Sequence, residues 1–538
     1  MKKGNPKFGK RAENLLKKSQ QLSKGDSEEP QPDPVTAEDF LVQGSIDEES
    51  GDRWLGSDLS KSLRFYQKAY SSYLKSIELS TPTDDSLLDS YYNSARLLFS
   101  VYSTYFKHGD GIDVEDLTNV DEVFNARPSV AQELPNIVNA HEQAMQIARS
   151  LGKKIPFDLL FNTAVVYTEL VEVEQENPDS DFNYLIDIFL KIKEILLTLM
   201  EAQVTELENF VNELTQINPV SSSVQVTHTS SEAEKQEELV SEEIVQPVDL
   251  YETVIASYKA IEALYENVTN EQHLIQVNTI ILPLLETTDR LSQGLIEKFS
   301  DNSPSKNEML ANISQEQINQ LVLNKTVLVG LSSDVNHVLE IWSNSELPDV
   351  AERYMIASDN IQTIIERNDI AIGQDKELFW KCLSQQSQLL KRAQEILNET
   401  YIARKKVPSG IEQGLGTLIC QLSEIMIARA DIELQRSSIS GLEASERNRD
   451  VLLQNVKNLL KSAMNIANSN GGLRERVSEK LQRDKKKSEA VFRLCLVENK
   501  TTIDELDKIM TRRRWVKEVP GIQKLGYYNQ FGVQNLHQ

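Results

Sequence analysis

The stretch Ser57–Tyr70 reads SDLSKSLRFYQKAY, and its pattern decides the fold class of the chain. Apolar side chains recur here and just beyond it at spacings of three and four residues, at Leu63, Tyr66, Ala69, Tyr70, Tyr73 and Ile77. This spacing predicts an amphipathic α-helix. The same spacing continues to about residue 214 and resumes from 248 to about 508, while alternating apolar runs with hairpin turns are scarce. We therefore expect an all-α protein.

Three residues of this stretch carry a second pattern. Ser62 and Ala69 are small, and the aromatic Tyr66 lies between them. Small residues let two helices approach closely, and an aromatic ring fills the groove between neighbouring helix pairs. This order resembles the second helix of a tetratricopeptide repeat (TPR).

Two later segments resemble the first helix of the same repeat. Asn93 and Ala95 lie in the segment DSYYNSARLLF, and Asn162, Ala164 and Tyr167 lie in FDLLFNTAVVY. The two asparagines are separated by about twice the TPR period of roughly 34 residues. The resemblance implies a TPR-like α-solenoid of stacked antiparallel helix pairs in two helical lobes. The layout is also similar to that of poorly characterised fungal TPR-like proteins.

Composition shifts predict the boundaries of the segments. We expect a disordered basic-then-acidic tail at 1–51 and a disordered Ser/Thr/Glu-rich linker at 218–247. Between and beyond them we expect a TPR-like lobe at 52–217, a second helical-repeat lobe at 248–508 and a basic, aromatic segment at 509–538.

The chain of 538 residues is strongly acidic, with a net charge of −25. The charge is uneven, because residues 1–24 carry eight Lys or Arg and one Glu, whereas 25–51 carry nine Asp or Glu and no base. A surface of this sign repels nucleic-acid phosphates and anionic lipids and attracts basic partners. We therefore expect a protein client that is basic or an extended peptide.

Motifs for catalysis are missing from the sequence. It contains no phosphate-binding Gly-x-x-x-x-Gly-Lys loop, no His-Glu-x-x-His and no Gly-x-Ser-x-Gly. The three cysteines are widely spaced, which argues against a disulfide framework or a zinc site and fits a reducing compartment. We expect no enzyme activity, no cofactor, no metal and no transmembrane segment, and a location in the cytoplasm, the nucleus or both.

The C-terminal segment combines bases with aromatic rings, at Arg512, Arg513, Arg514, Trp515, Tyr527, Tyr528 and Phe531. Such side chains suit docking onto a protein or stacking on single-stranded RNA. Alternatively, the segment folds back onto the body as a cap whose aromatic rings fill the last helix pair.

Taken together, the sequence favours a non-enzymatic scaffold or dedicated chaperone whose acidic surface holds a basic client. A ribonucleoprotein or RNA-processing factor that contacts RNA through the C-terminal segment is the first alternative. An adaptor in membrane traffic or at an organelle is the second.

Overall fold

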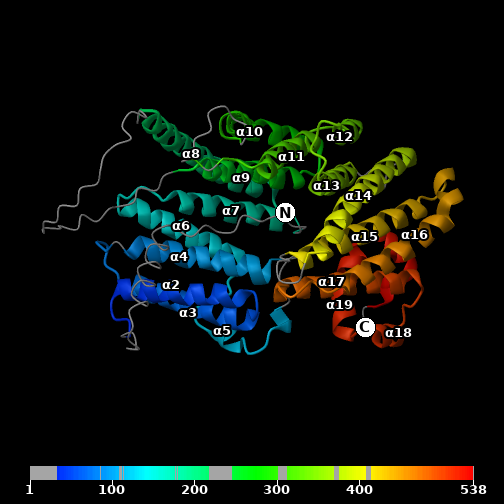
Figure 1. Ribbon diagram of the computed structural model, residues 1–538, viewed down its shortest axis with the longest axis horizontal. Coiled ribbons are helices and arrows are strands. Elements are labelled where there is room, and N and C mark those ends of the chain that lie inside the picture. The colour runs from blue at the N-terminus through cyan, green and yellow to red at the C-terminus, as the bar shows by residue number, and fades with distance from the viewer. Residues whose placement is uncertain are drawn as a thin grey trace.

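The computed structural model describes residues 33–536 apart from 85, 108–111, 113, 176, 178–179, 217–244, 301–309, 311, 369–374 and 408–413. Helices dominate this part of the chain, and no β-strand occurs among the described residues, which confirms the all-α prediction. Figure 1 shows an arc of helices that rises on one side, crosses the top and descends on the other.

The rising side begins with helix pairs that follow each other in chain order. Its helices are α2 (Ala37–Leu55), α3 (Leu59–Leu79), α4 (Ser86–Val101), α5 (Asp121–Asn125), α6 (Leu134–Ser150), α7 (Phe157–Glu174) and α8 (Phe182–Gln216). A π-helical turn, η1 (Tyr102–Phe106), extends α4, and a short 3-10 helix, η2 (Val114–Asp116), precedes α5.

The top of the arc and the descending side continue the array. Their helices are α9 (Pro247–Glu266), α10 (Glu271–Phe299), α11 (Gln315–Leu331), α12 (Val335–Trp342), α13 (Ala351–Arg367), α14 (Lys376–Lys405), α15 (Leu415–Ser438), α16 (Glu443–Ala467), α17 (Val477–Val497), α18 (Ile503–Ile509) and α19 (Arg512–Lys524). Two 3-10 helices, η3 (Gly526–Phe531) and η4 (Val533–Leu536), follow α19.

Helices that pack along each other are neighbours in chain order, such as α2 with α3, α13 with α14, and α15 with α16. Contacts restricted to near neighbours are the defining property of a solenoid, in which each unit buries its apolar face against the next. The structure therefore agrees with a solenoid-like array of stacked helix pairs.

Helix α2 corrects the predicted disordered tail. Residues 1–32 lie outside the described residues, but Thr36 caps a helix that begins at Ala37, and Asp39 completes the capping box. Two glycines of α2 allow α3 to approach closely, because a Cβ atom at Gly44 would overlap the ring of Tyr73. One at Gly51 would likewise lie 2.5 Å from Cε1 of Tyr66. The prediction of disorder is therefore wrong from residue 37 to residue 51.

The predicted linker at 218–247 lies mostly outside the described residues, at 217–244. Val245 is buried and Pro247 already belongs to α9, so the linker prediction extends too far at its end. One cluster of buried apolar residues runs from Leu41 in α2 to Ile439 after α15, and α8 packs on α9. The core therefore continues across this stretch and is not divided there.

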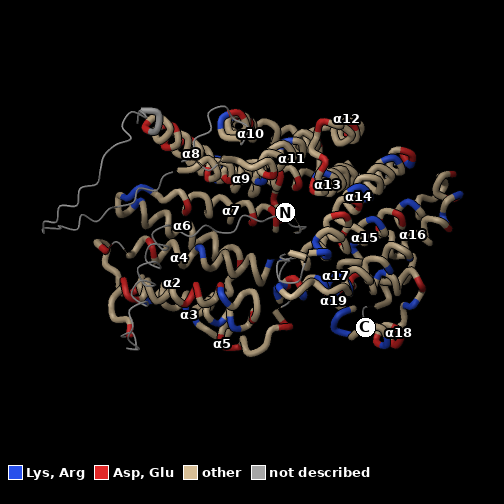
Figure 2. Tube along the Cα trace, viewed as in Figure 1, with Lys and Arg blue, Asp and Glu red and all other residues tan. Residues whose placement is uncertain are grey.

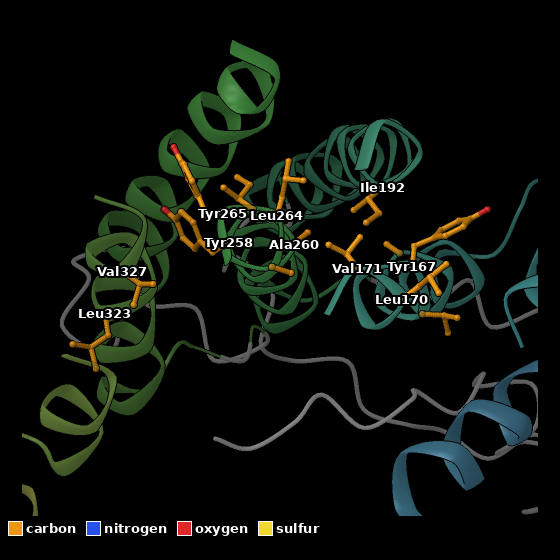
Figure 3. Packing of buried hydrophobic residues seen from close by; sticks show 14 of the residues in the cluster. Tyr167, Leu170, Val171, Ile192, Tyr258, Ala260, Leu264, Tyr265, Leu323 and Val327 are labelled. Atoms are coloured by element: carbon orange, nitrogen blue, oxygen red, sulfur yellow. The ribbon is translucent and has the colours of Figure 1, made fainter. Parts of the chain in front are cut away.

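Helix α9 joins the rising side to the top of the arc. Figure 3 shows Val171 of α7 and Ile192 of α8 on one side of it, and Val327 of α11 on the other. The hydroxyl of Tyr258 in α9 donates a hydrogen bond of 2.7 Å to Asp289 of α10. Helix α9 is thus surrounded by helices from both parts of the array.

A separate apolar cluster forms the end of the array. Its residues come from α15, α16, α17 and the segments after them, and include Phe492, Trp515, Tyr528 and Val533. The predicted C-terminal segment at 509–538 is therefore, as far as it is described, to residue 536, an integral part of the last helical layer.

Candidate functional site

The aromatic residues predicted to bind a partner face the protein interior. Trp515 is 1% exposed and Tyr528 is fully buried, while Tyr527 and Phe531 are half-buried against the same cluster. The indole Nε1 of Trp515 donates to Asp507 at 2.9 Å. The rings of Trp515 and Tyr528 are therefore unavailable for stacking on a nucleic acid or docking on a partner, so that prediction is wrong for these two residues. The alternative of an intramolecular cap agrees with the packing of all four rings against the last apolar cluster.

The arginines of the segment are all exposed. Arg512 pairs with Asp507 at 2.5 Å, and Arg513 pairs with Asp116 of η2 at 3.1 Å. Arg514 is exposed. Arg512 and the indole of Trp515 share the carboxylate of Asp507, so the polar groups of both are occupied by this chain's own residue.

The residues of the repeat pattern are all buried. Ser62, Tyr66 and Ala69 lie in α3, Asn93 and Ala95 in α4, and Asn162, Ala164 and Tyr167 in α7. The Nδ2 of Asn162 donates to the hydroxyl of Tyr92 at 2.9 Å, so this asparagine links two helices. These residues are buried within the helix contacts of the array, as the packing interpretation of the pattern predicts.

A second set of polar residues lies on the inner side of the arc and was not singled out from the sequence. On α7, Glu169 and Glu172 both pair with Lys107, which follows η1; the contact of Glu172 measures 3.0 Å. On α9, Glu262 pairs with Lys259, and Glu266 follows one turn later.

Glu266 is the clearest sign of concentrated negative charge. Burial, together with the negative charges of Glu262 and Glu172, raises the pKa of Glu266 to about 8. A carboxyl group with such a pKa holds a proton near neutral pH, because burial disfavours its charged form and the nearby acidic groups outweigh Lys259. Within the described part of the chain, Glu266 forms no ion pair.

The negative charge continues onto the descending side through α13 and α15. The side chain of Asp359 in α13 has an exposed surface, but many protein atoms surround it and partly exclude water from it. This partial loss of hydration, together with the negative charges of Glu424 and Glu262, raises the pKa of Asp359 to about 7. Glu424 of α15 faces Lys486 of α17 at 3.3 Å.

We call this set the acidic inner face: Glu169, Glu172, Glu262, Glu266, Asp359 and Glu424, with Lys107, Lys259 and Lys486. Its carboxyl groups outnumber its lysines. Figure 2 shows acidic stretches of α7, α9, α13 and α15 around the centre of the view. The carboxyl groups come from α7, α9, α13 and α15.

The sequence did contain a signal for this face. Lys259, Glu262 and Glu266 follow one another at three- and four-residue spacing, so they share one stripe of α9 beside its apolar stripes. What the sequence does not give is that α7, α9, α13 and α15 turn such stripes toward the same space.

Two further properties concern the described residues as a whole. None of their helices is both long and apolar enough to cross a bilayer. They contain no grouping of His, Cys, Asp and Glu side chains suited to holding a metal ion.

The fold and this face define a helical-array protein with a charged inner surface. Comparisons with known proteins show which proteins the chain is similar to. Residues 344–520 match the family described as the YNL193W C-terminal domain. The chain is 22% identical over 515 residues to "Uncharacterized protein YNL193W" of Saccharomyces cerevisiae, covering 86% of this chain and 90% of that protein. It is 25% identical over 439 residues to "UPF0656 protein C926.02" of Schizosaccharomyces pombe, covering 79% of this chain and 83% of that protein.

No solved structure matches the chain. The similarities support a relationship to a poorly characterised family of fungal proteins. The matched region begins between α12 and α13 and ends within α19, so it covers the descending side of the array. The resemblance to TPR proteins stays a prediction.

Proposed function

We propose that the protein is a non-enzymatic, TPR-like scaffold or dedicated chaperone that holds a basic, extended protein client on its acidic inner face. The observation that carries the proposal is the gathering of carboxyl groups from α7, α9, α13 and α15 in one place, where burial and neighbouring acidic groups raise the pKa of Glu266 and of Asp359. A cationic side chain placed between them would favour their ionised forms. It would lower both pKa values, release the proton that Glu266 retains near neutral pH, and pair with the resulting carboxylates.

The arrangement along the arc supports an extended client. The acidic residues come from four helices spread along the arc, α7, α9, α13 and α15. Solenoids commonly use their continuous inner surfaces to bind extended chains. A peptide with lysines or arginines at intervals suits acidic residues spread in this way, in the cytoplasm or the nucleus.

Binding of a labelled peptide tests the proposal. The probe is a fluorescein-labelled peptide rich in Lys and Arg and without His, titrated with the full chain and followed by fluorescence anisotropy. We expect saturable binding that weakens as the salt concentration rises above about 0.15 M, where the Debye length falls below about 8 Å.

A matched pair of variants locates the site. The inner variant carries Glu262→Gln, Glu266→Gln and Asp359→Asn, and the control carries Glu201→Gln, Glu208→Gln and Glu286→Gln, three exposed residues of α8 and α10. Both lose three carboxyl groups, and at a pH of about 9, above the pKa of Glu266 and of Asp359, both lose the same charge, so a general effect of net charge would weaken binding equally. Equal affinity of the two variants would contradict the proposal. A labelled single-stranded RNA in the same titration tests the RNA-binding alternative.

A further inference from the structure

The first and last parts of the array meet, although nothing in the nearest-neighbour packing requires it. Among the described residues, no helix from α2 to α6 packs along any helix from α13 to α19. Nevertheless, the backbone amide of Val477, the first residue of α17, donates to the carbonyl oxygen of Gly56, directly after α2, at 3.1 Å. This hydrogen bond therefore joins the two ends of the arc.

Ion pairs beside this hydrogen bond join the same two ends. The Nη2 of Arg513 in α19 lies 3.3 Å from Glu115 and 3.1 Å from Asp116, both in η2. The Nζ of Lys517 lies 2.8 Å from Glu115. All four side chains are exposed to water, from 40% for Lys517 to 69% for Glu115.

Both partners are held firmly by their own side of the array. On α19, Trp515, Val519 and Ile522 are buried, and Arg513 and Lys517 lie one turn apart on a different face. Near η2, the amide of Thr118 donates to Ser60 of α3, and Arg64 of α3 donates to the carbonyl of Asn119. The two bases thus lie on a helix with a buried apolar face, and the two carboxylates lie in a short helix whose following residues are hydrogen-bonded to α3.

We propose that Arg513 and Lys517 with Glu115 and Asp116 form an ionic clasp that holds the helical arc closed and controls access to the acidic inner face. Exposed ion pairs are weak and screened by salt, whereas the helix pairs of the array share buried apolar cores. The clasp is therefore the contact that opens first. Small rotations between successive helix pairs then add up along the array and separate its ends.

The charges of the inner face give the clasp a second role. Acidic groups of α9 and α13 lie close enough to hinder one another's ionisation. A basic client would pair with these groups in their ionised form, and a closed arc would hold that client, so closure of the clasp and retention of the client favour each other. This second role rests on the proposed function, whereas the clasp itself does not.

Distance measurements between the two ends test the clasp without any client. Nitroxide labels are attached at Ser57→Cys and Arg474→Cys, two exposed positions that flank the contact between Gly56 and Val477. The native cysteines Cys382, Cys420 and Cys495 are buried, and burial raises the pKa of each thiol, so brief labelling modifies the introduced cysteines. Pulsed electron–electron double resonance then measures the distance between the two nitroxide labels.

Charge reversal and its compensation give the decisive comparison. Arg513→Glu with Lys517→Glu should lengthen and broaden the distance distribution, and adding Glu115→Lys with Asp116→Lys should restore it. Arg514→Glu, on the same helix but outside the clasp, should leave the distance unchanged. An identical distance in the wild type and the double reversal would overturn the clasp.

Dissociation of the labelled basic peptide tests control of access. The double reversal should release the peptide about threefold faster or more, as expected for the loss of exposed ion pairs, and the compensated variant should release it at the wild-type rate. If the distance responds but the release rate does not, control of access is overturned. If the wild type binds no basic peptide while the distance still responds, the proposed function fails and the clasp alone stands.

Discussion

The hydroxyl of Tyr528 donates a hydrogen bond of 2.6 Å to Oδ1 of Asp431, which ties the C-terminal segment to the middle of α15. The other oxygen of Asp431 accepts from Nε of Arg493 in α17 at 3.3 Å. The polar groups of Tyr528, Asp431 and Arg493 are largely shielded from water. Their hydrogen bonds to one another offset the cost of burying them. The last part of the chain is thereby a structural cap.

Replacement of Tyr528 should destabilise the protein strongly. Tyr528→Ala should lower the free energy of unfolding by about 3–5 kcal/mol because it leaves a cavity in the last apolar cluster. Tyr528→Phe should cost about 1–2 kcal/mol because it removes only the hydroxyl. Urea unfolding followed by circular dichroism measures both. Tyr184→Phe, at a half-exposed position of α8, is the control. If Tyr528→Ala unfolded at the wild-type urea concentration, the segment would not be a cap.

The close approach of α2 and α3 predicts opposite effects for two Gly-to-Ala substitutions within helices. At Gly44 the added methyl group overlaps the ring of Tyr73, so Gly44→Ala should cost about 1–3 kcal/mol. At Gly294 of α10 no atom lies within 4 Å of the added carbon, so Gly294→Ala should gain about 0.5–1 kcal/mol. The midpoint temperatures of thermal unfolding of the two variants measure these effects. Equal shifts of both variants would contradict the packing of α2 on α3.

The buried ion pair between Glu48 and Arg96 also links α2 to the array. Its atoms lie 2.6 Å apart, and Glu48 also accepts from the hydroxyl of Tyr73 at 2.7 Å. Glu48→Leu alone should cost about 3–5 kcal/mol because it leaves the guanidinium buried and unpaired.

A double-mutant cycle separates the loss of the pair from the burial of a single charge. Glu48→Leu combined with Arg96→Leu should cost less than the sum of the two single changes, as judged from urea unfolding. Additive costs would show that the two groups do not interact.

Stability should depend on pH through Glu266. Its pKa is 4.5 in an ordinary environment and about 8 in the folded protein. Between these values the folded state retains a proton that the unfolded chain has lost, so the free energy of unfolding falls as the pH rises through this range. Glu266→Gln should flatten this slope and should be more stable than the wild type at a pH of about 8.

Urea unfolding at several pH values checks this expectation. Glu208→Gln, an exposed substitution on α8, should follow the wild-type slope. A Glu266→Gln variant with the same slope as the wild type would show that Glu266 does not hold the proton.

The sequence predicted the helices of the array well where apolar residues marked them. The pattern from Leu63 to Ile77 predicted α3, and Asn93 and Asn162 correctly marked buried positions of α4 and α7. It failed for α2, because the buried face of this helix consists of Leu41, Gly44, Ser45, Glu48 and Gly51. Glycine, serine and glutamate are typical of disordered segments, and only the rings of Tyr66 and Tyr73 turn them into a helix contact.

The candidate site, like the fold, could be predicted from the sequence only in part. The basic and aromatic residues near the C-terminus were conspicuous in the sequence, but composition does not show that Trp515 and Tyr528 point inward. The acidic inner face was inconspicuous, because Glu172, Glu266, Asp359 and Glu424 are ordinary helix residues when taken one at a time.

The sequence by itself determined an acidic, all-α chain of amphipathic helices, because apolar spacing and net charge are local properties. Only the tertiary structure decided that these helices bend into an arc, that Arg513 meets Asp116 at its ends, and that Glu266 and Asp359 share the enclosed space. The reason is physical: the curvature of an array arises from small rotations between successive helix pairs, and no single stretch of residues encodes their sum.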